Sequence, residues 1–453
     1  MSNWEDYEEV IKDHLKLKSF FYYYNLKVGE KLLKIDVFPA SYGESFLVTC
    51  AGEQNCYFLI DMGFMSTYSN SIKSKLLEIK NNGESLSLMI LTHIDDDHIS
   101  GAIKFFVENG NSEHPKIIKV ENIWFNSYRH LQFEKKTFDE KIQTNKNIVI
   151  LENLIKKERP REKGLRNVGS IGALQGSTLA SLLYYYNYLG DWNSHFNNNA
   201  VVVEEEEVAA FRKIKITDEV NITILSPDIN KLRALNDLWR EKLVSEGFEG
   251  TISSNELMDD AFEVYSANTR GLNKRKKNLY NISSYRDIEQ IANEQMDADC
   301  SPVNGSSIAF FLEFQEKRVL FLADSHPDIV LGNLKEIALK EKVKKVYFDA
   351  VKVSHHGSKH NTSRELLEII DTDKFIFSTN GRGKGFTHPD IETVFRIITI
   401  KMDRTKKLIF NYKPAHLFQI INRNELKEKY NYEIIYINDL SLRKDNHITT
   451  III

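Results

Sequence analysis

Short apolar runs alternate with polar, helix-like stretches at both ends of the chain. Runs rich in β-branched and aromatic residues are typical of strands, and in the N-terminal part they cover 32–38, 45–50, 56–61 and 86–92. Two stretches beside them carry apolar positions at helical spacing, at 68–80 and 99–108. This alternation predicts strands and helices mixed along one region.

The C-terminal part repeats the alternation. The runs 306–314 and 318–324 predict a hairpin. Further helices are expected at 327–339 and 363–370, and further strands at 349–354 and 374–379. Asn361 and Ser363 precede the second of these helices and are expected to cap it. Strands mixed with helices at both ends predict an α/β protein with a mixed or mostly antiparallel sheet.

The middle of the chain has a different pattern. It is long, polar and irregular, with one clear strand near 220–227 and one expected helix at 231–246. A structureless loop of that length is rare inside a compact domain, so we expect an insertion that has helices of its own. The predicted division is an N-terminal helix and lead-in at 1–29, a core formed by 30–130 and 301–453, and the insertion at 131–300.

Composition limits the classes of function. The 453 residues include 60 Lys and Arg and 64 Asp and Glu, so the net charge is −4. This balance argues against a chain that is basic throughout, but the clusters at 156–163 and 273–277 leave a local groove for a phosphate backbone open. The three cysteines lack a CxxC spacing, which favours a cytoplasmic protein without a disulfide framework. No signal-like start or apolar run of about 18 residues occurs, so no membrane contact is expected.

The stretch LTHIDDDHISG (91–101) carries the strongest chemical signal. Between an apolar strand and a helix it places four side chains of metal-binding type: His93, Asp95, Asp97 and His98. In an extended loop, residues two apart point to the same side, so His93 and Asp95 can hold one metal ion. Asp97 and His98 lie on the next turn and are placed to hold a second ion about 3.5–4 Å away.

This stretch resembles the first-ligand motif of the metallo-β-lactamase superfamily, His-x-His-x-Asp-His, with Asp95 in place of the second histidine. In that substitution it resembles the ComEC-like (Rec2-like) branch of metallo-hydrolases. Other stretches are similar to family motifs in the expected order: SYGESFLV (41–48), FLIDMG (58–63), NGSSIAFFL (304–312), VLFLADSHPD (319–328), VKVSHHGSKHNTS (351–363) and STNGRGKGFTHPD (378–390). The resemblance covers roughly 30–130 and 300–395.

The resemblance implies the αβ/βα four-layer sandwich of this superfamily, with the middle of the chain as an inserted, partly helical subdomain. It also implies two divalent metal ions held by His93, Asp95, Asp97, His98, Asp324 and a histidine of the pair His355 and His356. Asp324 corresponds to the carboxylate that bridges the ions. His356 aligns better with the last ligand of the family, and His355 is the alternative. Asp61 corresponds to the aspartate that braces the metal loop from behind.

One histidine of the family pattern is absent. On the strand before the bridging aspartate the chain offers Asn304 or Ser306, so one ion is expected to have fewer protein ligands. His326 follows the bridging aspartate closely and is expected beside the ligands or at the start of a helix. Asp95 shifts the site toward oxygen ligands, which favours Mn²⁺ and also Mg²⁺ as alternatives to Zn²⁺.

The activity that the resemblance implies is hydrolysis by a water molecule that the two ions activate, with Asp97 among the catalytic groups. His388 closes the late Gly-rich loop and is expected to act as a general acid or to bind a phosphate oxygen. The alternative is a turn histidine that caps the following helix. Arg382 and Lys384 lie on the same loop and are expected to bind phosphate.

These features favour a phosphodiesterase or nuclease that acts on nucleic acid, since ComEC-like relatives are associated with DNA degradation. Two alternatives stay open. One is a hydrolase of a small molecule, such as a cyclic nucleotide, another phosphoester or a lactone, with the 131–300 insertion as a lid. The other is a partner-dependent effector subunit of a bacterial defence system, which binds a protein through that insertion.

Overall fold

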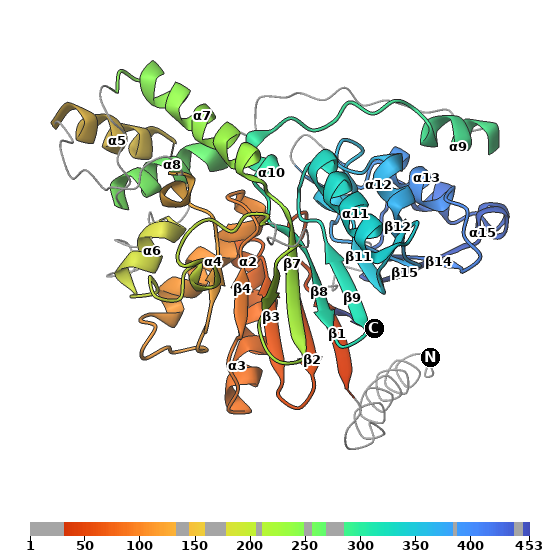
Figure 1. The fold of residues 1–453 in the computed structure, drawn as a ribbon, viewed down its shortest axis with the longest axis horizontal. Coiled ribbons are helices and arrows are strands. Elements are labelled where there is room, and N and C mark those ends of the chain that lie inside the picture. The colour runs from red at the N-terminus through yellow and green to blue at the C-terminus, as the bar shows by residue number, and fades with distance from the viewer. Residues whose placement is uncertain are drawn as a thin grey trace, which may run out of the picture.

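The computed structural model describes residues 31–132, 145–158, 178–204, 211–248, 256–268, 285–383, 387–438 and 447–453. It is an α/β protein with two mixed sheets, of six and eight strands, and with helices interleaved between the strands (Figure 1). The predicted α/β class is therefore confirmed. The helix predicted at the N-terminus and the basic cluster at 273–277 lie outside the described residues, as does part of the cluster at 156–163.

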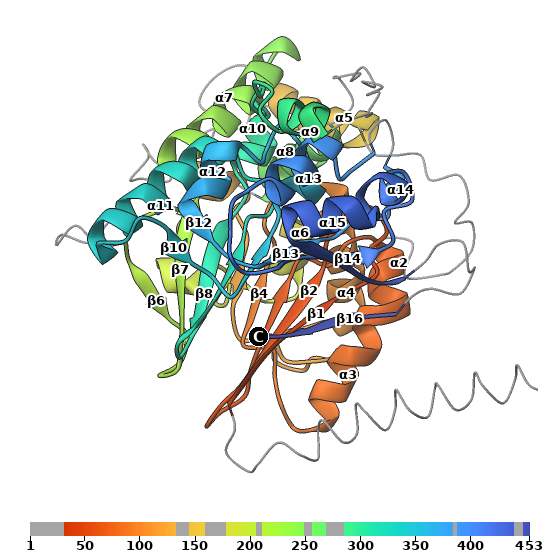
Figure 2. The same cartoon turned by 90° about the vertical axis from the view of Figure 1, so that its right-hand side faces the viewer.

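The N-terminal strands form the six-stranded sheet, whose order is β16-β1-β2-β3-β4-β5. Its strands are β1 Leu32–Val37, β2 Phe46–Ala51, β3 Cys56–Ile60, β4 Leu88–Ile90, β5 Ile123–Trp124 and β16 Thr449–Ile452. β1, β2 and β3 are antiparallel neighbours, and β4 and β5 continue the sheet parallel to β3. The C-terminal β16 pairs antiparallel with β1, so segments from the two ends of the chain lie side by side (Figure 2).

The eight-stranded sheet has the order β15-β14-β13-β11-β9-β8-β7-β6. Its strands are β6 Lys213–Lys215, β7 Val220–Ser226, β8 Ala309–Phe314, β9 Lys317–Phe321, β11 Ala350–Lys352, β13 Lys374–Phe377, β14 Lys406–Tyr412 and β15 Tyr432–Asn438. The strands from β6 to β9 are antiparallel, and those from β9 to β15 are parallel. The predicted hairpin is confirmed as β8 and β9, and the strand expected in the middle of the chain is β7. A separate parallel pair consists of β10 Val346–Tyr347 and β12 Ile370–Asp371.

The helices predicted at 68–80, 99–108, 231–246, 327–339 and 363–370 are present with small shifts at their ends, and further helices occur elsewhere. Their bounds are α2 Met65–Thr67, α3 Lys73–Asn81, α4 Asp96–Asn109, α5 Asn145–Glu158, α6 Leu179–Tyr185, α7 Ile229–Ser245, α8 Glu256–Asn268, α9 Tyr285–Ala292, α10 Pro302–Gly305, α11 Pro327–Glu341, α12 Arg364–Ile369, α13 Ile391–Ile398, α14 Phe418–Ile421 and α15 Asn424–Tyr430. Shorter turns are the π-helical η1 Tyr68–Ile72 and the 3₁₀ turns η2 Tyr128–Leu131, η4 Ser194–Phe196 and η6 Ser354–Gly357. Among the described residues, no helix combines the length and the apolar character needed to cross a membrane.

An apolar layer joins the two sheets face to face. It includes Ile35 and Phe46 from the first sheet and Phe310 and Phe321 from the second. The rings of Phe46 and Phe321 meet edge to face with their centroids 5.8 Å apart, and the rings of Phe310 and Phe321 stack at 5.4 Å. Because burying one such side chain stabilises a fold by roughly 1.5–3 kcal/mol, this layer holds the sheets in a defined relative position.

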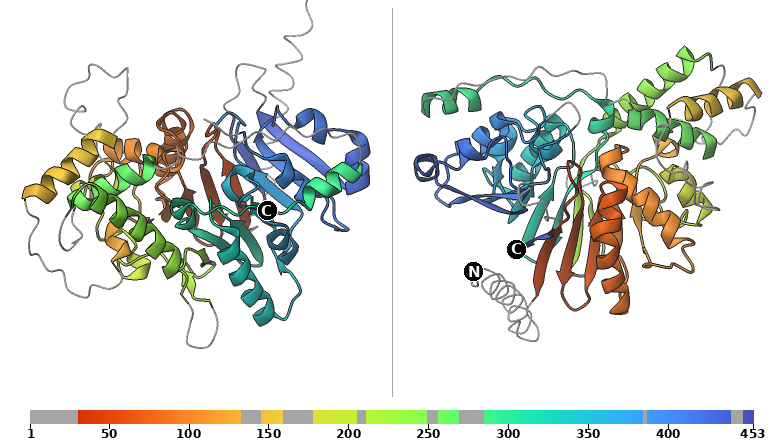
Figure 3. Two further views of the ribbon diagram at one scale, coloured as in Figure 1. Left: turned by 90° about the horizontal axis from the view of Figure 1, so that it is seen from above. Right: turned by 180° about the vertical axis from the view of Figure 1, so that it is seen from behind.

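Helices cover the outer face of each sheet. Leu47, Leu59 and Met89 of the first sheet share an apolar cluster with α3, α4 and the helices from α5 to α8. In the second sheet, Leu320 packs in a cluster with α11, and Phe377 in a cluster with α13. Figure 3 shows the yellow and light-green helices α5 to α8 gathered on one side and the blue C-terminal helices on the other, where the bright green α9 also lies. The two sheets therefore lie between helical layers, and their strand ends meet in the interior.

Candidate metal centre

The predicted site residues converge where strands of both sheets end. Each follows the carboxyl end of a strand: Asp61 follows β3, His93 follows β4, Asp324 follows β9, and His355 and His356 follow β11. β3 and β4 are parallel neighbours, as are β9 and β11, so the carboxyl ends within each pair lie at the same sheet edge. The packing of the two sheets brings these edges together.

Helix α4 begins three residues before its predicted start at Ile99. Asp95 is the N-cap residue with an extended backbone, and Asp96 and Asp97 lie in the first turn. Carboxylates near a helix N-terminus interact favourably with the helix dipole, which explains why the run of aspartates joins the helix. As a result Asp97 and His98 are buried, whereas Asp96 is exposed.

The carboxylate of Asp324 is the centre of the cluster. Its Oδ2 lies 3.3 Å from Nε2 of His355 and 3.7 Å from Nε2 of His93. Its Oδ1 lies 3.6 Å from Nε2 of His98. On the Oδ2 side of Asp324, Nε2 of His93 is also 3.3 Å from Oδ2 of Asp95. The two oxygens of one carboxylate thus face different sets of ligand-type groups.

A second group adjoins the Oδ1 side. Nε2 of His356 lies 3.5 Å from Oδ2 of Asp97. The ligand atoms of Asp97, His98 and His356 all lie within 4.8 Å of one another, as do those of His93, His98 and Asp324. These buried side chains form His and Asp clusters that can hold metal ions.

Asp61 hydrogen-bonds directly to His98 and, through Thr92, is linked to His93. Its Oδ2 accepts hydrogen bonds from Nδ1 of His98 at 2.7 Å and from the hydroxyl of Thr92 at 2.8 Å, and its Oδ1 accepts one from the backbone N–H of Thr92 at 2.8 Å. Because the Thr92 hydroxyl donates to Asp61, its oxygen accepts the bond from Nδ1 of His93 at 3.0 Å. Both imidazoles therefore turn Nε2, the atom that can bind a metal ion, toward the cluster.

The other two histidines have the same orientation. Nδ1 of His355 donates to Oδ1 of Asn361 at 2.9 Å, and Nδ1 of His356 donates to the backbone carbonyl of Ser378 at 2.8 Å. Their Nε2 atoms then carry the lone pair. In metal sites, a hydrogen bond at one ring nitrogen of a histidine commonly orients the other nitrogen toward the metal ion. All four imidazoles here have such a hydrogen bond at Nδ1.

Replacing Asp61 by asparagine is expected to weaken metal binding about 10–100-fold, because the asparagine amide cannot accept all three hydrogen bonds at once. Asn also tolerates the left-handed backbone at this position, where φ is 53°, so the fold should persist. Calorimetric titration of the metal-free protein with Mn²⁺ or Zn²⁺ measures the change. An affinity equal to that of the wild type, with an unchanged circular dichroism spectrum, would contradict the bracing role.

The chemistry of the cluster fits bound cations. Among the described residues, Nε2 of His93, His98 and His356 is buried and makes no hydrogen bond. Buried carboxylates also outnumber buried cations here. The acidic groups are Asp61, Asp95, Asp97, Asp324 and Glu44, and the buried lysine among them is Lys352. Burying unbalanced negative charge is costly, and divalent cations would both neutralise it and use the inward-facing nitrogens.

The electrostatics of the histidines agree with this charge surplus. Burial disfavours the charged form of His98, but the carboxylates of Asp61 and Asp324 outweigh it and raise the pKa of His98 to about 9. Burial lowers the pKa of His356 to about 3, which keeps its imidazole in the neutral form that binds metals. Burial also opposes the charge of Asp324, yet the surrounding imidazoles, His355 first, hold the pKa of its carboxyl well below its ordinary value.

The double-histidine turn η6 has an unusual backbone. His355, His356 and Gly357 have φ values of 46°, 54° and 88°, so three consecutive residues lie in the left-handed region. Such a conformation costs non-glycine residues roughly 1–3 kcal/mol each and is concentrated at functional sites. Here it lets two adjacent side chains point into the same interior. A Cβ at Gly357 would also lie 2.5 Å from Cβ of Pro389, so no other residue fits there.

Sequence reasoning missed Glu44 and Lys352. Both are buried, and the Lys352 ammonium is in contact with a carboxylate oxygen of Glu44. The same carboxylate lies 3.2 Å from Nδ1 of His356, and the backbone N–H of Glu44 donates to the carbonyl of Asp97 at 3.1 Å. The available signal was a charged residue inside each of two family-like motifs, at 41–48 and 351–363.

The residues offered in place of the absent histidine do not face the ligands directly. The Ser306 hydroxyl donates to the carbonyl of Val303 at 2.7 Å. The Asn304 amide donates to Oδ2 of Asp299 at 2.6 Å. Asp299, another residue that the sequence did not indicate, lies 3.7 Å from Nδ1 of His355. Burial opposes its charge, but His355 and Asn304 hold the pKa of Asp299 well below its ordinary value.

Two residues near helix starts have different roles. His326 occupies the N-cap position of α11, and its Nδ1 lies 3.1 Å from Nζ of Lys231, so it is at the helix start rather than among the ligands. Ser363 caps α12 as predicted, by accepting from the N–H of Leu366. The predicted cap role of Asn361 is wrong, because its side chain instead contacts His355 and the carbonyl of Asp324.

The late Gly-rich loop brings His388 beside the double-histidine turn. His388 is buried, and its ring centroid lies 5.3 Å from that of His355 and 6.5 Å from that of His356. Its Nδ1 is 3.3 Å from Oδ2 of Asp390. Arg382 is exposed on the same loop, and Lys384 lies outside the described residues.

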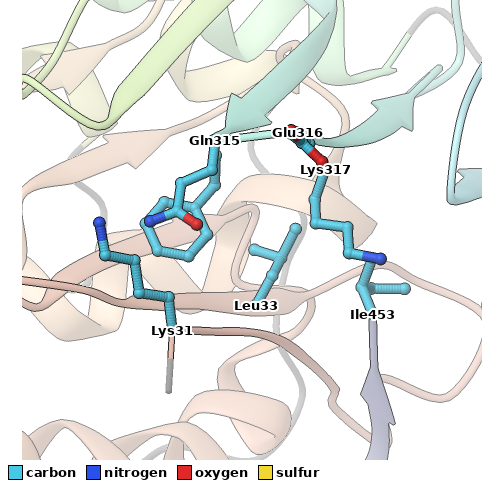
Figure 4. Close-up of a pocket in the computed structure, with 7 residues that line it drawn as sticks. Lys31, Leu33, Gln315, Glu316, Lys317 and Ile453 are labelled. Carbon is cyan, nitrogen blue, oxygen red and sulfur yellow. The ribbon is translucent and has the colours of Figure 1, made fainter. Parts of the chain in front are cut away.

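A pocket lies beside the β8–β9 hairpin (Figure 4). Its lining comes from the start of β1, the β8–β9 hairpin and the C-terminus: Lys31, Leu33, Phe314, Gln315, Glu316, Lys317 and Ile453. Lys317 begins β9, whereas Asp324 follows the end of that strand. The pocket and the metal centre therefore lie at opposite ends of β9, and the pocket contributes no group to the cluster.

A scan against protein-family models and a search of the curated proteins find no match to this chain. What the fold and the site define is an α/β protein with two mixed sheets and with buried His, Asp and Glu groups that can hold metal ions.

Proposed function

We propose that this protein is a binuclear metal-dependent hydrolase with the αβ/βα sandwich of the metallo-β-lactamase superfamily, in its ComEC-like branch. The observation that carries the proposal is the convergence of three inward-facing Nε2 atoms, of His93, His98 and His355, on the two oxygens of Asp324. The four-layer order of helices, two sheets and helices supports the same fold. The motif resemblance points to this family independently of the geometry.

The ligand sets follow from the two sides of Asp324. His93 and Asp95 would hold one divalent ion on the Oδ2 side. Asp97, His98 and His356 would hold the other on the Oδ1 side. Such ions supply a nucleophilic water at neutral pH and stabilise the negative charge that develops on a phosphoryl or carbonyl group. Zn²⁺ and Mn²⁺ both suit this mixed imidazole and carboxylate set, and Mg²⁺ is a third candidate.

Other residues would position substrate and move protons. His388 is buried beside the double-histidine turn, with Oδ2 of Asp390 3.3 Å from its Nδ1, and we assign it as the general acid for the leaving group. The Asp390 carboxyl supports this, since its interaction with His388 outweighs burial and lowers its pKa to about 2. Arg382, exposed on the same loop, would bind a phosphate oxygen together with Lys384.

The substrate class that we favour is a nucleic-acid phosphodiester, in keeping with the ComEC-like resemblance and the exposed Arg382. One observation favours a smaller substrate. Asp324 and His93 are 0% and 2% exposed, so access to the ligands is narrow. A cyclic nucleotide, a small phosphoester or a lactone is therefore the second candidate. For either substrate, the 131–300 insertion is proposed to contact the substrate or a protein partner.

Hydrolysis assays with defined metals test the proposal. Metal-stripped protein is reloaded with Zn²⁺, Mn²⁺ or Mg²⁺ and given single- and double-stranded DNA, RNA, a cyclic nucleotide, a generic phosphodiester and a lactone. Asp97→Ala is expected to lower the rate at least about 10²–10³-fold, because it removes a buried ligand-type group. Asp96→Ala is the matched control, since the neighbouring Asp96 is exposed, and it should retain most of the activity.

Each outcome selects one interpretation. Cleavage of nucleic acid that Asp97→Ala abolishes supports the nuclease. Cleavage of the small esters alone moves the assignment to the second candidate. Metal uptake without hydrolysis of any substrate overturns the autonomous hydrolase and favours an effector subunit that acts only with a partner.

A further inference from the structure

The two consecutive histidines of η6 approach different carboxylates. Nε2 of His355 lies 3.3 Å from Oδ2 of Asp324, the oxygen that His93 also approaches. Nε2 of His356 lies 3.5 Å from Oδ2 of Asp97. The left-handed backbone at both residues sends adjacent side chains to opposite sides of the Asp324 carboxylate.

Without His355, the Oδ2 side has few ligand-type groups. His93 and Asp95 would provide one ligand each to an ion there, and Asp324 would add a shared oxygen. A metal ion with nitrogen and oxygen ligands commonly takes four or more. The Ser306 hydroxyl is directed toward the carbonyl of Val303, to which it donates a hydrogen bond. Among the described residues, the imidazole that lies nearest to Oδ2 of Asp324 is that of His355.

A hydrogen-bonded support behind His355 fixes its orientation. Oδ1 of Asn361 accepts from Nδ1 of His355 at 2.9 Å. The Asn361 amide donates to Oδ2 of Asp299 at 3.0 Å and to the carbonyl of Asp324 at 3.1 Å. Asp299 also accepts from Asn304 at 2.6 Å. The segment before β8 thus contributes a carboxylate that positions a histidine of another loop, rather than a ligand of its own.

We propose that the two histidines serve different ions. His355 completes the site of His93 and Asp95, His356 completes the site of Asp97 and His98, and Asp299 acts through Asn361 as a positioning residue for His355. This inference rests on the binuclear centre of the proposed function. It explains how the site without the family's histidine keeps a full set of ligands.

Metal stoichiometry in paired variants tests the assignment. Wild type at a saturating free Mn²⁺ or Zn²⁺ concentration is expected to retain two ions per chain by elemental analysis. His355→Ala combined with Asp95→Asn should retain one ion, because both changes affect the same site. His355→Ala combined with Asp97→Asn should retain none. The pattern reverses for His356→Ala, which should retain one ion with Asp97→Asn and none with Asp95→Asn.

The alternatives give different counts. Two ions in His355→Ala, or one ion in His355→Ala with Asp97→Asn, overturns the inference and leaves the binuclear centre intact. Fewer than two ions in the wild type overturns the binuclear centre itself and the inference with it. Glutamine variants at both histidines provide the same comparison where an alanine variant does not fold.

The positioning role of Asp299 has a separate readout. Asp299→Asn is expected to weaken one of the two metal-binding steps about 10–100-fold and to leave the other unchanged in a calorimetric titration. Asp297→Asn is the matched control, because Asp297 lies two residues away and is exposed. A loss of thermal stability without a change in either binding step, or an equal loss in both steps, overturns the role.

Discussion

Replacing Asp324 by asparagine is expected to release both ions of the proposed binuclear centre and to lower the proposed hydrolysis by at least about 10³-fold. Such a loss exceeds the usual cost of removing one hydrogen-bond donor from an active site. Both oxygens of Asp324 are needed, because His93 and His355 approach Oδ2 whereas His98 approaches Oδ1. An asparagine keeps the shape of the side chain but replaces one oxygen by an amide donor, which repels a cation. Elemental analysis and the hydrolysis assay measure the two effects.

The control for this change is Asp328→Asn in the same sequence motif. Asp328 lies in the first turn of α11 and its side chain is 67% exposed, paired with Lys231. This variant should bind two ions and keep its activity within a few-fold. Retention of two ions in Asp324→Asn would contradict the bridging role and would require another carboxylate to join the two ligand sets.

Replacing Lys352 by methionine is expected to lower the free energy of unfolding by about 3–5 kcal/mol. The side chains of Lys352 and Glu44 are only 1% and 2% exposed, so the substitution leaves the Glu44 carboxylate buried without its cation. Glu44 also contacts His356 and the backbone of Asp97, so the unpaired carboxylate would disturb residues of the candidate metal centre. Urea unfolding of the metal-free protein gives the change in stability without the contribution of bound ions.

The double variant Glu44→Gln with Lys352→Met distinguishes pairing from packing. Removing both charges removes the uncompensated carboxylate, so we expect the double variant to be more stable than Lys352→Met alone. A double variant less stable than either single variant would show that the two side chains contribute through packing and not as an ion pair.

Local patterns were enough to predict much of the fold. The runs that form β1, β2, β3 and β7 and the β8–β9 hairpin were visible as short β-branched and aromatic segments. The start of α4 was placed too late because three consecutive aspartates resemble a loop, whereas their charges favour the N-terminus of a helix. Which strands become neighbours within each sheet depends on contacts between residues that are far apart in the sequence. The pairing of β16 with β1 joins segments from near the two ends of the chain.

The sequence by itself determined the ligand-type groups of the candidate site, because histidines and aspartates at close spacing beside apolar strands have few structural uses. It also indicated the bracing role of Asp61. Only the tertiary structure placed Glu44, Lys352 and Asp299 at the site, since each is an ordinary charged residue in its local sequence. Only the tertiary structure also showed that His355 and His356 approach different carboxylates. The directions of these adjacent side chains depend on a left-handed backbone, which packing against neighbouring loops imposes.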